Sequence, residues 1–139
     1  MNFHRILKLF RPRVLVRLTY PVKYPSPSEA IKHLDLAIRC LKKQGNQGVW
    51  FLSFQQRGAP FFWLALSKYV PKDSFAQKWF EIVGSGDQAH FQSGVSINGF
   101  HFAKGIDQFL EKSIVPVMKN PDFQYGTFGN LKATILSCF

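Results

Sequence analysis

The sequence predicts an α+β fold in which an antiparallel central sheet is flanked by helices. Three observations lead to this prediction. Residues Arg13 to Tyr20 alternate between apolar and polar side chains, which is the two-residue period of a strand. Two aromatic-rich runs between Trp50 and Leu66 flank a short polar turn, as in a β-hairpin. Residues Pro27 to Lys43 carry apolar side chains at helical spacing.

The bulk composition is that of a folded, strongly basic protein. A chain of 139 residues with 46% hydrophobic residues is expected to form one compact domain spanning residues 1–139. The formal charge is +10, from 18 Lys and Arg against 8 Asp and Glu. Such an excess indicates a polyanionic partner, most often nucleic acid and less often an acidic protein or a membrane surface. The alternative is a merely soluble basic protein, and composition does not separate the two.

The first third of the chain is expected to hold a short amphipathic element, a strand and a long helix. Met1 to Phe10 mixes apolar and basic residues, as a short helix or a strand lead-in would. In the strand that follows, one face would carry Val14, Val16, Leu18 and Tyr20, and the other Arg13, Leu15, Arg17 and Thr19. Ser26, Pro27 and Glu29 form a capping box that opens the helix running to about Lys43. Its apolar stripe is Ile31, Leu34, Ile38 and Leu41.

The hairpin places its side chains on two faces by alternation. The first strand would turn Trp50, Leu52 and Phe54 to one face, and Phe51, Ser53 and Gln55 to the other. The second strand would alternate Phe61, Trp63 and Ala65 with Phe62, Leu64 and Leu66.

The second half is expected to contain two further helices and a weak strand. Asp73 is a plausible N-cap for the first of these helices, which would end in the glycine-rich turn Val83 to Asp87. This turn lacks the P-loop lysine, so a phosphate loop is only a minor alternative. A weak strand is expected at Gln92 to Ile97, followed by a turn at Asn98-Gly99. The last helix would cover Phe102 to Lys112, with Ile106, Phe109 and Leu110 facing inward.

The cysteine content and the hydropathy pattern indicate a cytoplasmic protein. Cys40 and Cys138 have neither metal-ligand spacing nor a disulfide framework, so a reducing cytosol is the default, and Cys40 is expected in the core. No apolar run approaches the roughly 18 residues of a membrane span. Met1 to Phe10 lacks the long apolar region of a secretion signal.

Two segments carry a resemblance to a known family. Phe54 to Pro60 reads Phe-Gln-Gln-Arg-Gly-Ala-Pro, and Trp79 to Asp87 reads Trp-Phe-Glu-Ile-Val-Gly-Ser-Gly-Asp. Both resemble motifs of the rolling-circle replication initiators (Rep proteins) of the HUH endonuclease superfamily, in the family's order. Leu18 to Pro21 and Tyr125 to Gly129 are similar to the family's first strand end and its closing segment. The resemblance implies a Rep-like fold, a relative of the RRM and ferredoxin-like folds.

The residues that perform the family's chemistry are replaced. By resemblance, the two metal-binding histidines fall on Phe61 and Trp63 and the glutamate on Ser53. The two catalytic tyrosines fall on Gly105 and Phe109. A phenyl or indole ring offers a metal no lone pair, and neither Gly nor Phe has a hydroxyl to attack phosphate. The sequence therefore predicts a degenerate, catalytically inactive homologue without a metal or other cofactor.

The replaced site suggests two interpretations. Phe61 and Trp63 lie two residues apart on one strand, so with Arg13 and Arg17 they could form a stacking platform for single-stranded nucleic acid. Alternatively, the former cleft has filled with apolar side chains and is now core. Phosphate contacts are expected from basic residues near the cleft, although each could equally be a solvated surface charge. These residues are Arg11, Arg13, Arg17, Lys23, Arg57, Lys68, Lys72 and Lys78.

Two functions of different classes remain open. In the first, a Rep-derived protein of a phage, plasmid or other mobile element inhibits a host nucleic-acid-targeting complex, such as a CRISPR effector complex, by binding it. In the second, an inactive Rep paralogue regulates rolling-circle replication by binding single-stranded or hairpin DNA at the origin. A third and weaker hypothesis is an enzyme with a rebuilt site.

Overall fold

The computed structural model describes residues 3–21, 23–100 and 102–131; Cys138 lies outside them. It contains a five-stranded antiparallel sheet with strand order β4-β1-β3-β2-β5. The strands are β1 (Val14–Leu18), β2 (Gly48–Phe54), β3 (Pro60–Leu66), β4 (Val95–Gly99) and β5 (Gln124–Phe128). The helices are α1 (Phe3–Phe10), α2 (Pro27–Lys43), α3 (Lys72–Val83), α4 (Gln88–Ser93) and α5 (Phe102–Phe109), which continues as a π-helix (Leu110–Ile114) and a 3₁₀ turn (Val115–Val117). The predicted α+β class is confirmed.

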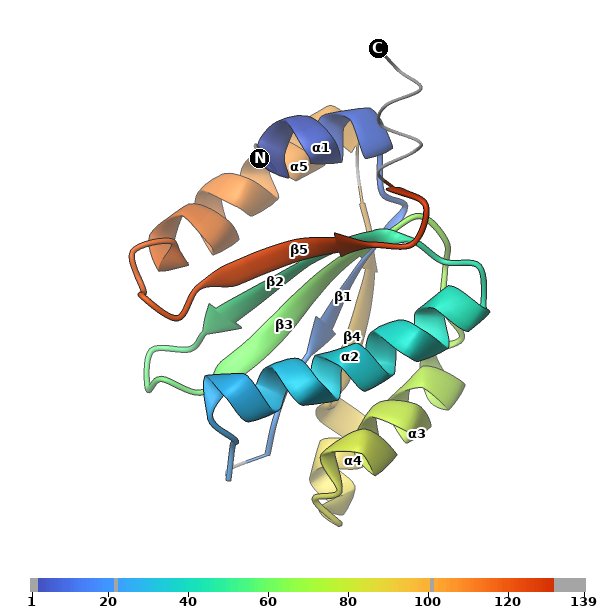
Figure 1. Ribbon diagram of the computed structural model, residues 1–139, viewed down its shortest axis with the longest axis vertical. Helices are drawn as coiled ribbons and strands as arrows, with labels where there is room; N and C mark the ends of the chain where they lie inside the picture. Colours follow the sequence, from blue (N-terminus) through green and yellow to red (C-terminus); the bar gives the residue numbers. More distant parts are fainter. Residues whose placement is uncertain (1–2, 22, 101, 132–139) are drawn as a thin grey trace.

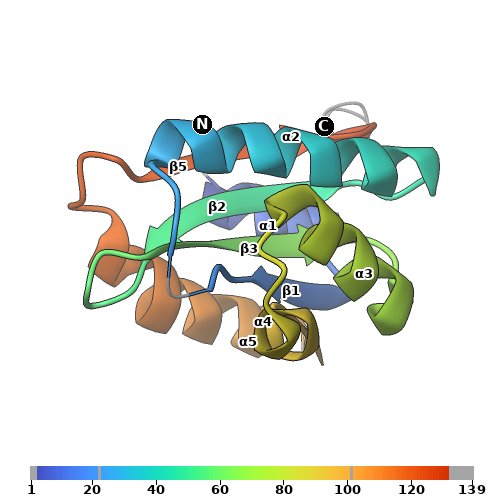
Figure 2. The ribbon, with the colours of Figure 1, turned by 90° about the horizontal axis from the view of Figure 1, so that it is seen from below.

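Helices cover both faces of the sheet. Helices α2 and α3 lie on one face, and α1 and α5 on the other (Figures 1 and 2). The order β1-α2-β2-β3-α3-β4 is the β-α-β-β-α-β arrangement of ferredoxin-like proteins, with β5 added beside β2. Among the described residues, the longest apolar helical stretch falls short of what a membrane crossing requires.

The face under α2 and α3 is the larger core. Val14, Val16 and Leu18 are fully buried there, which confirms the predicted facing of β1. The even-numbered residues of the hairpin turn to the same side. They pack against Leu34 and Leu41 of α2 and against Phe75 and Trp79 of α3.

The opposite face forms a second core under α1 and α5. The N-terminal segment is a helix, and its buried side chains are Ile6, Leu7 and Phe10. Helix α5 and the π-helix bury Ile106, Phe109 and Leu110, as predicted. Between them the sheet contributes Val49, Phe51 and Ala65. The sheet is therefore apolar on both faces.

Helix α2 begins where the capping pattern placed it. Ser26 is the N-cap, and its Oγ accepts a hydrogen bond from the Glu29 backbone N–H at 3.3 Å. The Glu29 carboxylate does not complete the box but accepts from Lys32 Nζ at 3.3 Å. Cys40, expected in the core, is only half-buried.

Three local predictions in the second half were wrong. The N-cap of helix α3 is Pro71, whose ψ of 114° is that of extended backbone. Asp73 therefore lies inside the first turn, where its negative charge interacts favourably with the helix dipole. Asn98 and Gly99 are not a turn but part of β4, where they pair with Leu15 and Val14 of β1. Long-range pairing thus overrides a local turn preference. The strand expected at Gln92 to Ile97 begins only at Val95, in β4, because Gln92 and Ser93 end the short helix α4.

Candidate functional site

The candidate site lies on the sheet face under α1 and α5. Strand register places Arg17 of β1 beside Trp63 of β3, and Trp63 beside Phe51 of β2. One row along the hairpin, Ser53 pairs with Phe61. Because alternate residues of a strand share a face, these side chains form two neighbouring rows on one side of the sheet.

Three rings make up an aromatic cluster, defined here as Phe61, Trp63 and Phe109. The Phe61 and Trp63 centroids are 5.6 Å apart at 75°, and those of Trp63 and Phe109 are 5.4 Å apart at 80°. Such edge-to-face pairs contribute about 0.5–1.5 kcal/mol each beyond area burial. Phe61 and Phe109 are each 7% exposed. Positions that the resemblance assigns to two metal ligands and one nucleophile therefore meet in one contiguous apolar cluster.

Arg17 covers one side of this cluster. Its Cζ lies 4.7 Å from the centroid of the Phe61 ring and 5.6 Å from that of Trp63. Guanidinium stacking of this kind contributes about 0.5–1 kcal/mol at partly exposed sites. The Nε atom of Arg17 is buried without a hydrogen-bond partner among the described residues. Arg17 is thus the one predicted cation that touches the rings.

The stacking-platform interpretation does not fit Phe61. A base can stack only on an exposed ring face, and Phe61 is buried with Arg17 above it. Trp63 is half-buried. The arrangement fits the alternative, in which aromatic side chains have filled the former cleft.

Ser53 is a buried polar residue on this face. It is fully buried, and its Oγ has no hydrogen-bond partner among the described residues. An unsatisfied buried hydroxyl costs about 1–3 kcal/mol. The position that the resemblance assigns to a glutamate ligand therefore holds a serine whose hydroxyl is buried among apolar side chains.

Replacing this serine with alanine should stabilise the protein. We expect Ser53→Ala to raise the free energy of unfolding by about 1 kcal/mol, since it removes a desolvated hydroxyl at little cost in volume. Urea unfolding followed by circular dichroism measures the change. The matched control is Ser67→Ala, which should destabilise because the Ser67 hydroxyl donates to Asn46 Oδ1 at 3.2 Å. A loss of stability in Ser53→Ala would show that this hydroxyl has a partner.

The predicted basic residues do not form one patch around the cleft. Arg11, Arg13, Lys68 and Lys72 lie at the end of the sheet where β1 begins and β3 ends, as the hydrogen bond from Arg13 N to Leu66 O at 2.8 Å shows. Phe61 lies at the other end of the seven-residue strand β3, roughly 20 Å away at 3.3 Å per residue. The expectation that Lys68 and Lys72 flank the cleft was therefore wrong.

The remaining predicted cations are divided between two places. Lys23 and Arg57 lie at the Phe61 end, where the Tyr24 hydroxyl donates to Arg57 O at 3.3 Å. Lys78 is on the exposed side of α3, across the sheet from the aromatic cluster, and therefore not near the cleft as expected. From the predicted set, the Arg17 guanidinium stacks on Phe61 and Trp63.

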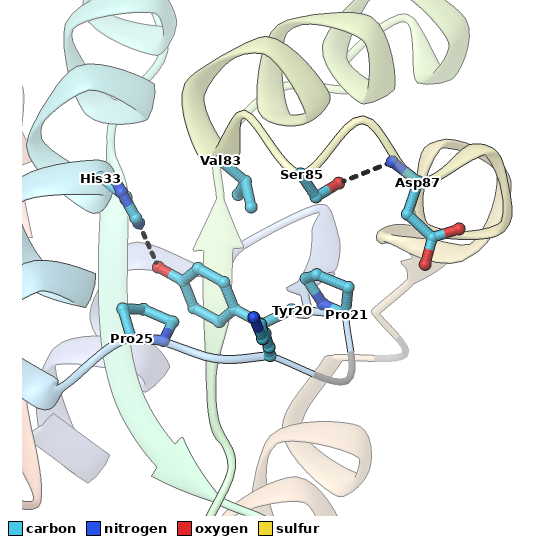
Figure 3. A pocket seen from close by; sticks show the side chains of 8 residues that line it. Tyr20, Pro21, Pro25, His33, Val83, Ser85 and Asp87 are labelled. Carbon is cyan, nitrogen blue, oxygen red and sulfur yellow. Dashed lines mark hydrogen bonds between the residues drawn. The ribbon is translucent and has the colours of Figure 1, made fainter.

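A separate pocket of about 430 Å³ opens on the α2–α3 side, where β1 ends (Figure 3). It lies between two segments that carry the family resemblance, Leu18 to Pro21 and Trp79 to Asp87. Its lining residues are Tyr20, Pro21, Lys23, Pro25, His33, Val83, Ser85 and Asp87. The Tyr20 hydroxyl and His33 Nδ1 share a hydrogen bond of 2.9 Å. Burial raises the pKa of Tyr20 well above its ordinary value, so its hydroxyl stays protonated and is a poor nucleophile.

His90 holds Ser85, a residue of the pocket lining, in place. This role was not predicted from the sequence. The Nε2 atom of His90 donates to the Thr19 carbonyl at 2.7 Å. In the neutral ring Nδ1 must then accept, and the Ser85 hydroxyl donates to it at 3.2 Å. Ser85 Oγ in turn accepts from Asp87 N at 3.2 Å. This chain of bonds ties the glycine-rich turn to the end of β1, so the turn has a structural role that its residue pattern did not reveal.

His33, in the lining of this pocket, is expected to make the free energy of unfolding depend on pH. Burial lowers the pKa of His33 below 6.5, and the nearby Glu29 carboxylate only partly opposes this. The unfolded chain therefore binds a proton at His33 before the folded chain does. We expect the contribution of His33 to stability to be complete above pH 6.5 and to be lost as the pH falls through the folded pKa. Unfolding curves between pH 7.5 and 5 test this, and His33→Gln should flatten the dependence.

Comparison with known proteins gave no match to a protein-family model, a curated protein or a solved structure. Within the described ranges, no group of three or more His, Cys, Asp or Glu side chains is placed to hold a metal ion.

Proposed function

We propose that the chain is a catalytically inactive, Rep-derived protein of a mobile genetic element that acts by binding and inhibits a host nucleic-acid-targeting complex of the CRISPR effector type. The aromatic cluster carries this proposal. Phe61, Trp63 and Phe109 occupy the positions that the resemblance gives to metal and nucleophile, and they pack ring against ring. Convergence of two segments distant in sequence, β3 and α5, on one site supports the residue-by-residue mapping.

The chemistry of these side chains argues for binding without cutting. Polarising a scissile phosphate requires ligands with lone pairs, and a phosphotyrosyl link requires a hydroxyl. The four tyrosines are Tyr20, Tyr24, Tyr69 and Tyr125, and none falls between residues 100 and 112. The charge of +10 nevertheless remains, and it favours anionic partners.

Most of the predicted cations are exposed, whereas Phe61 of the aromatic cluster is buried. This difference favours inhibition over regulation of an origin. A regulator must recognise one origin, which requires contacts to bases. Phe61 is buried, whereas Arg11, Arg13, Lys68 and Lys72 are exposed. Contacts from lysine and arginine side chains to phosphates carry no sequence information by themselves.

The test uses a panel of purified CRISPR effector complexes of different types, each with a fluorescent target duplex. We expect the protein, at concentrations near that of the complex, to block target binding or cleavage by at least one of them. Binding to labelled DNA hairpins is measured in parallel, with an origin-type hairpin and a scrambled one. Failure to block any complex, together with a strong preference for the origin hairpin, would replace the inhibitor with the replication regulator.

A further inference from the structure

The outer surface of α2 and α3 contains a groove that is separate from the aromatic cluster and from the pocket lined by Tyr20. It has a volume of about 380 Å³ and runs between the two helices. Arg39 and Lys43 of α2 and Lys78 of α3 line it. Arg39 and Lys43 are four residues apart, so they lie on the same side of α2.

The charges of this groove are not neutralised within the described part of the chain. None of these three cations forms a salt bridge with a described residue. The single carboxylate in the lining, Glu81, accepts a hydrogen bond from Gln77 at 2.9 Å. The groove therefore has an excess of positive charge directed toward solvent.

The floor of the groove is apolar. Leu36 is 45% exposed, although it belongs to a helix that buries Leu34 and Ala37 completely or nearly so. Half-buried Cys40 and Ile82 complete the floor. An exposed leucine in the same groove as these cations is more than phosphate binding requires, since a nucleic-acid backbone gains little from an apolar contact.

We propose that this groove, here called the α2–α3 groove, docks an acidic amphipathic segment of a partner protein. Leucine-type side chains of that segment would cover Leu36 and Ile82, while its carboxylates would face Arg39, Lys43 and Lys78. This is helix-in-groove recognition with complementary charge. The inference rests on the proposed binding function and names the surface through which a protein partner is held.

The experiment uses a fluorescein-labelled, helix-forming peptide with leucine on one face and glutamate on both flanks. Its binding is followed by fluorescence anisotropy. A matched peptide with glutamine in place of glutamate, and a short DNA duplex, are measured beside it. We expect the acidic peptide to bind about tenfold more tightly than the glutamine peptide, because each exposed ion pair contributes a modest increment. The Arg39→Glu/Lys78→Glu variant should lose about tenfold in affinity for the acidic peptide.

Two controls make the result specific to the groove. Lys112→Glu/Lys119→Glu changes the net charge equally at exposed positions outside it and should leave peptide binding unchanged. In a Cys138→Ser background, bound peptide should protect Cys40 from alkylation. Equal loss of binding in both charge-reversal variants, no protection of Cys40, or competition by duplex DNA for the same cations would overturn the proposal. Because the readout is peptide binding, such a failure leaves the test on CRISPR complexes standing on its own.

Discussion

The double variant Phe61→His/Trp63→His places histidine at both positions that the resemblance assigns to metal ligands. It is expected to destabilise the protein severely and to show no DNA cutting. The change removes the ring contacts of Phe61 with Trp63 and of Trp63 with Phe109. It also places two polar, titratable rings beside the buried Nε of Arg17. Replacing one large buried aromatic side chain by alanine costs about 3–5 kcal/mol, and imidazole recovers part of that volume.

For the pair we expect a loss of about 5 kcal/mol in the free energy of unfolding, against about 5–15 kcal/mol for a whole domain. Guanidinium or thermal unfolding measures this loss. The matched control is Tyr24→His/Tyr69→His, which makes the same kind of change at rings that are 46% and 66% exposed. The control should stay within about 1 kcal/mol of the parent protein. A double variant at 61 and 63 as stable as this control would show that the cluster is not part of the core.

Truncation of Trp79 is expected to have the largest effect of any single substitution. Trp79 is 1% exposed, and its Nε1 donates to the Thr19 carbonyl at 2.8 Å. Its ring meets Tyr20 edge-on at 5.4 Å and Phe62 at 6.4 Å. Trp79→Ala should therefore lower the free energy of unfolding by about 3–5 kcal/mol, through the cavity and the lost hydrogen bond.

A graded series separates the two causes. Trp79→Phe keeps one aromatic ring but loses the indole N–H and part of the ring volume, while the Thr19 carbonyl still accepts from His90. We expect it to cost about 1–2 kcal/mol. Lys78→Ala, at the neighbouring exposed position of the same helix, should change stability by less than about 0.5 kcal/mol. Equal effects of Trp79→Ala and Lys78→Ala in urea unfolding would contradict the packing described for α3.

The sequence predicted strand β1 and the hairpin better than the short helix α4 and strand β4. The alternation of side chains in β1 and in the hairpin assigns these residues to the correct faces of the sheet, because successive side chains of a strand point to opposite faces. The start of α2 follows from Ser26 and Pro27, whose effects are local. Helix α4 has six residues, too few for a periodic signal, and the place of Asn98 in β4 depends on a strand distant in sequence.

In the candidate site, too, some contacts could be predicted from the sequence and others could not. The contact between Phe61 and Trp63 can be predicted because the two residues are two apart on one strand. The contact of Phe109 with Trp63 depends on how α5 packs on the sheet, and no local sequence pattern predicts that packing. The burial of Phe61 belongs to one of the two interpretations that the sequence leaves open, since strand pairing alone does not say which face is covered. Arg39 and Lys43 could have been noticed from their spacing of four on the exposed side of α2.

The central claim is that the former cleft is filled with rings and the molecule binds without cutting. The most direct measurement is intact-protein mass spectrometry after incubation with a randomised pool of single-stranded and hairpin DNA and Mn²⁺, with an active Rep protein as positive control. We predict that the mass of the chain remains that of the free protein. A covalent nucleotide adduct mapped to any of its tyrosines would contradict the account.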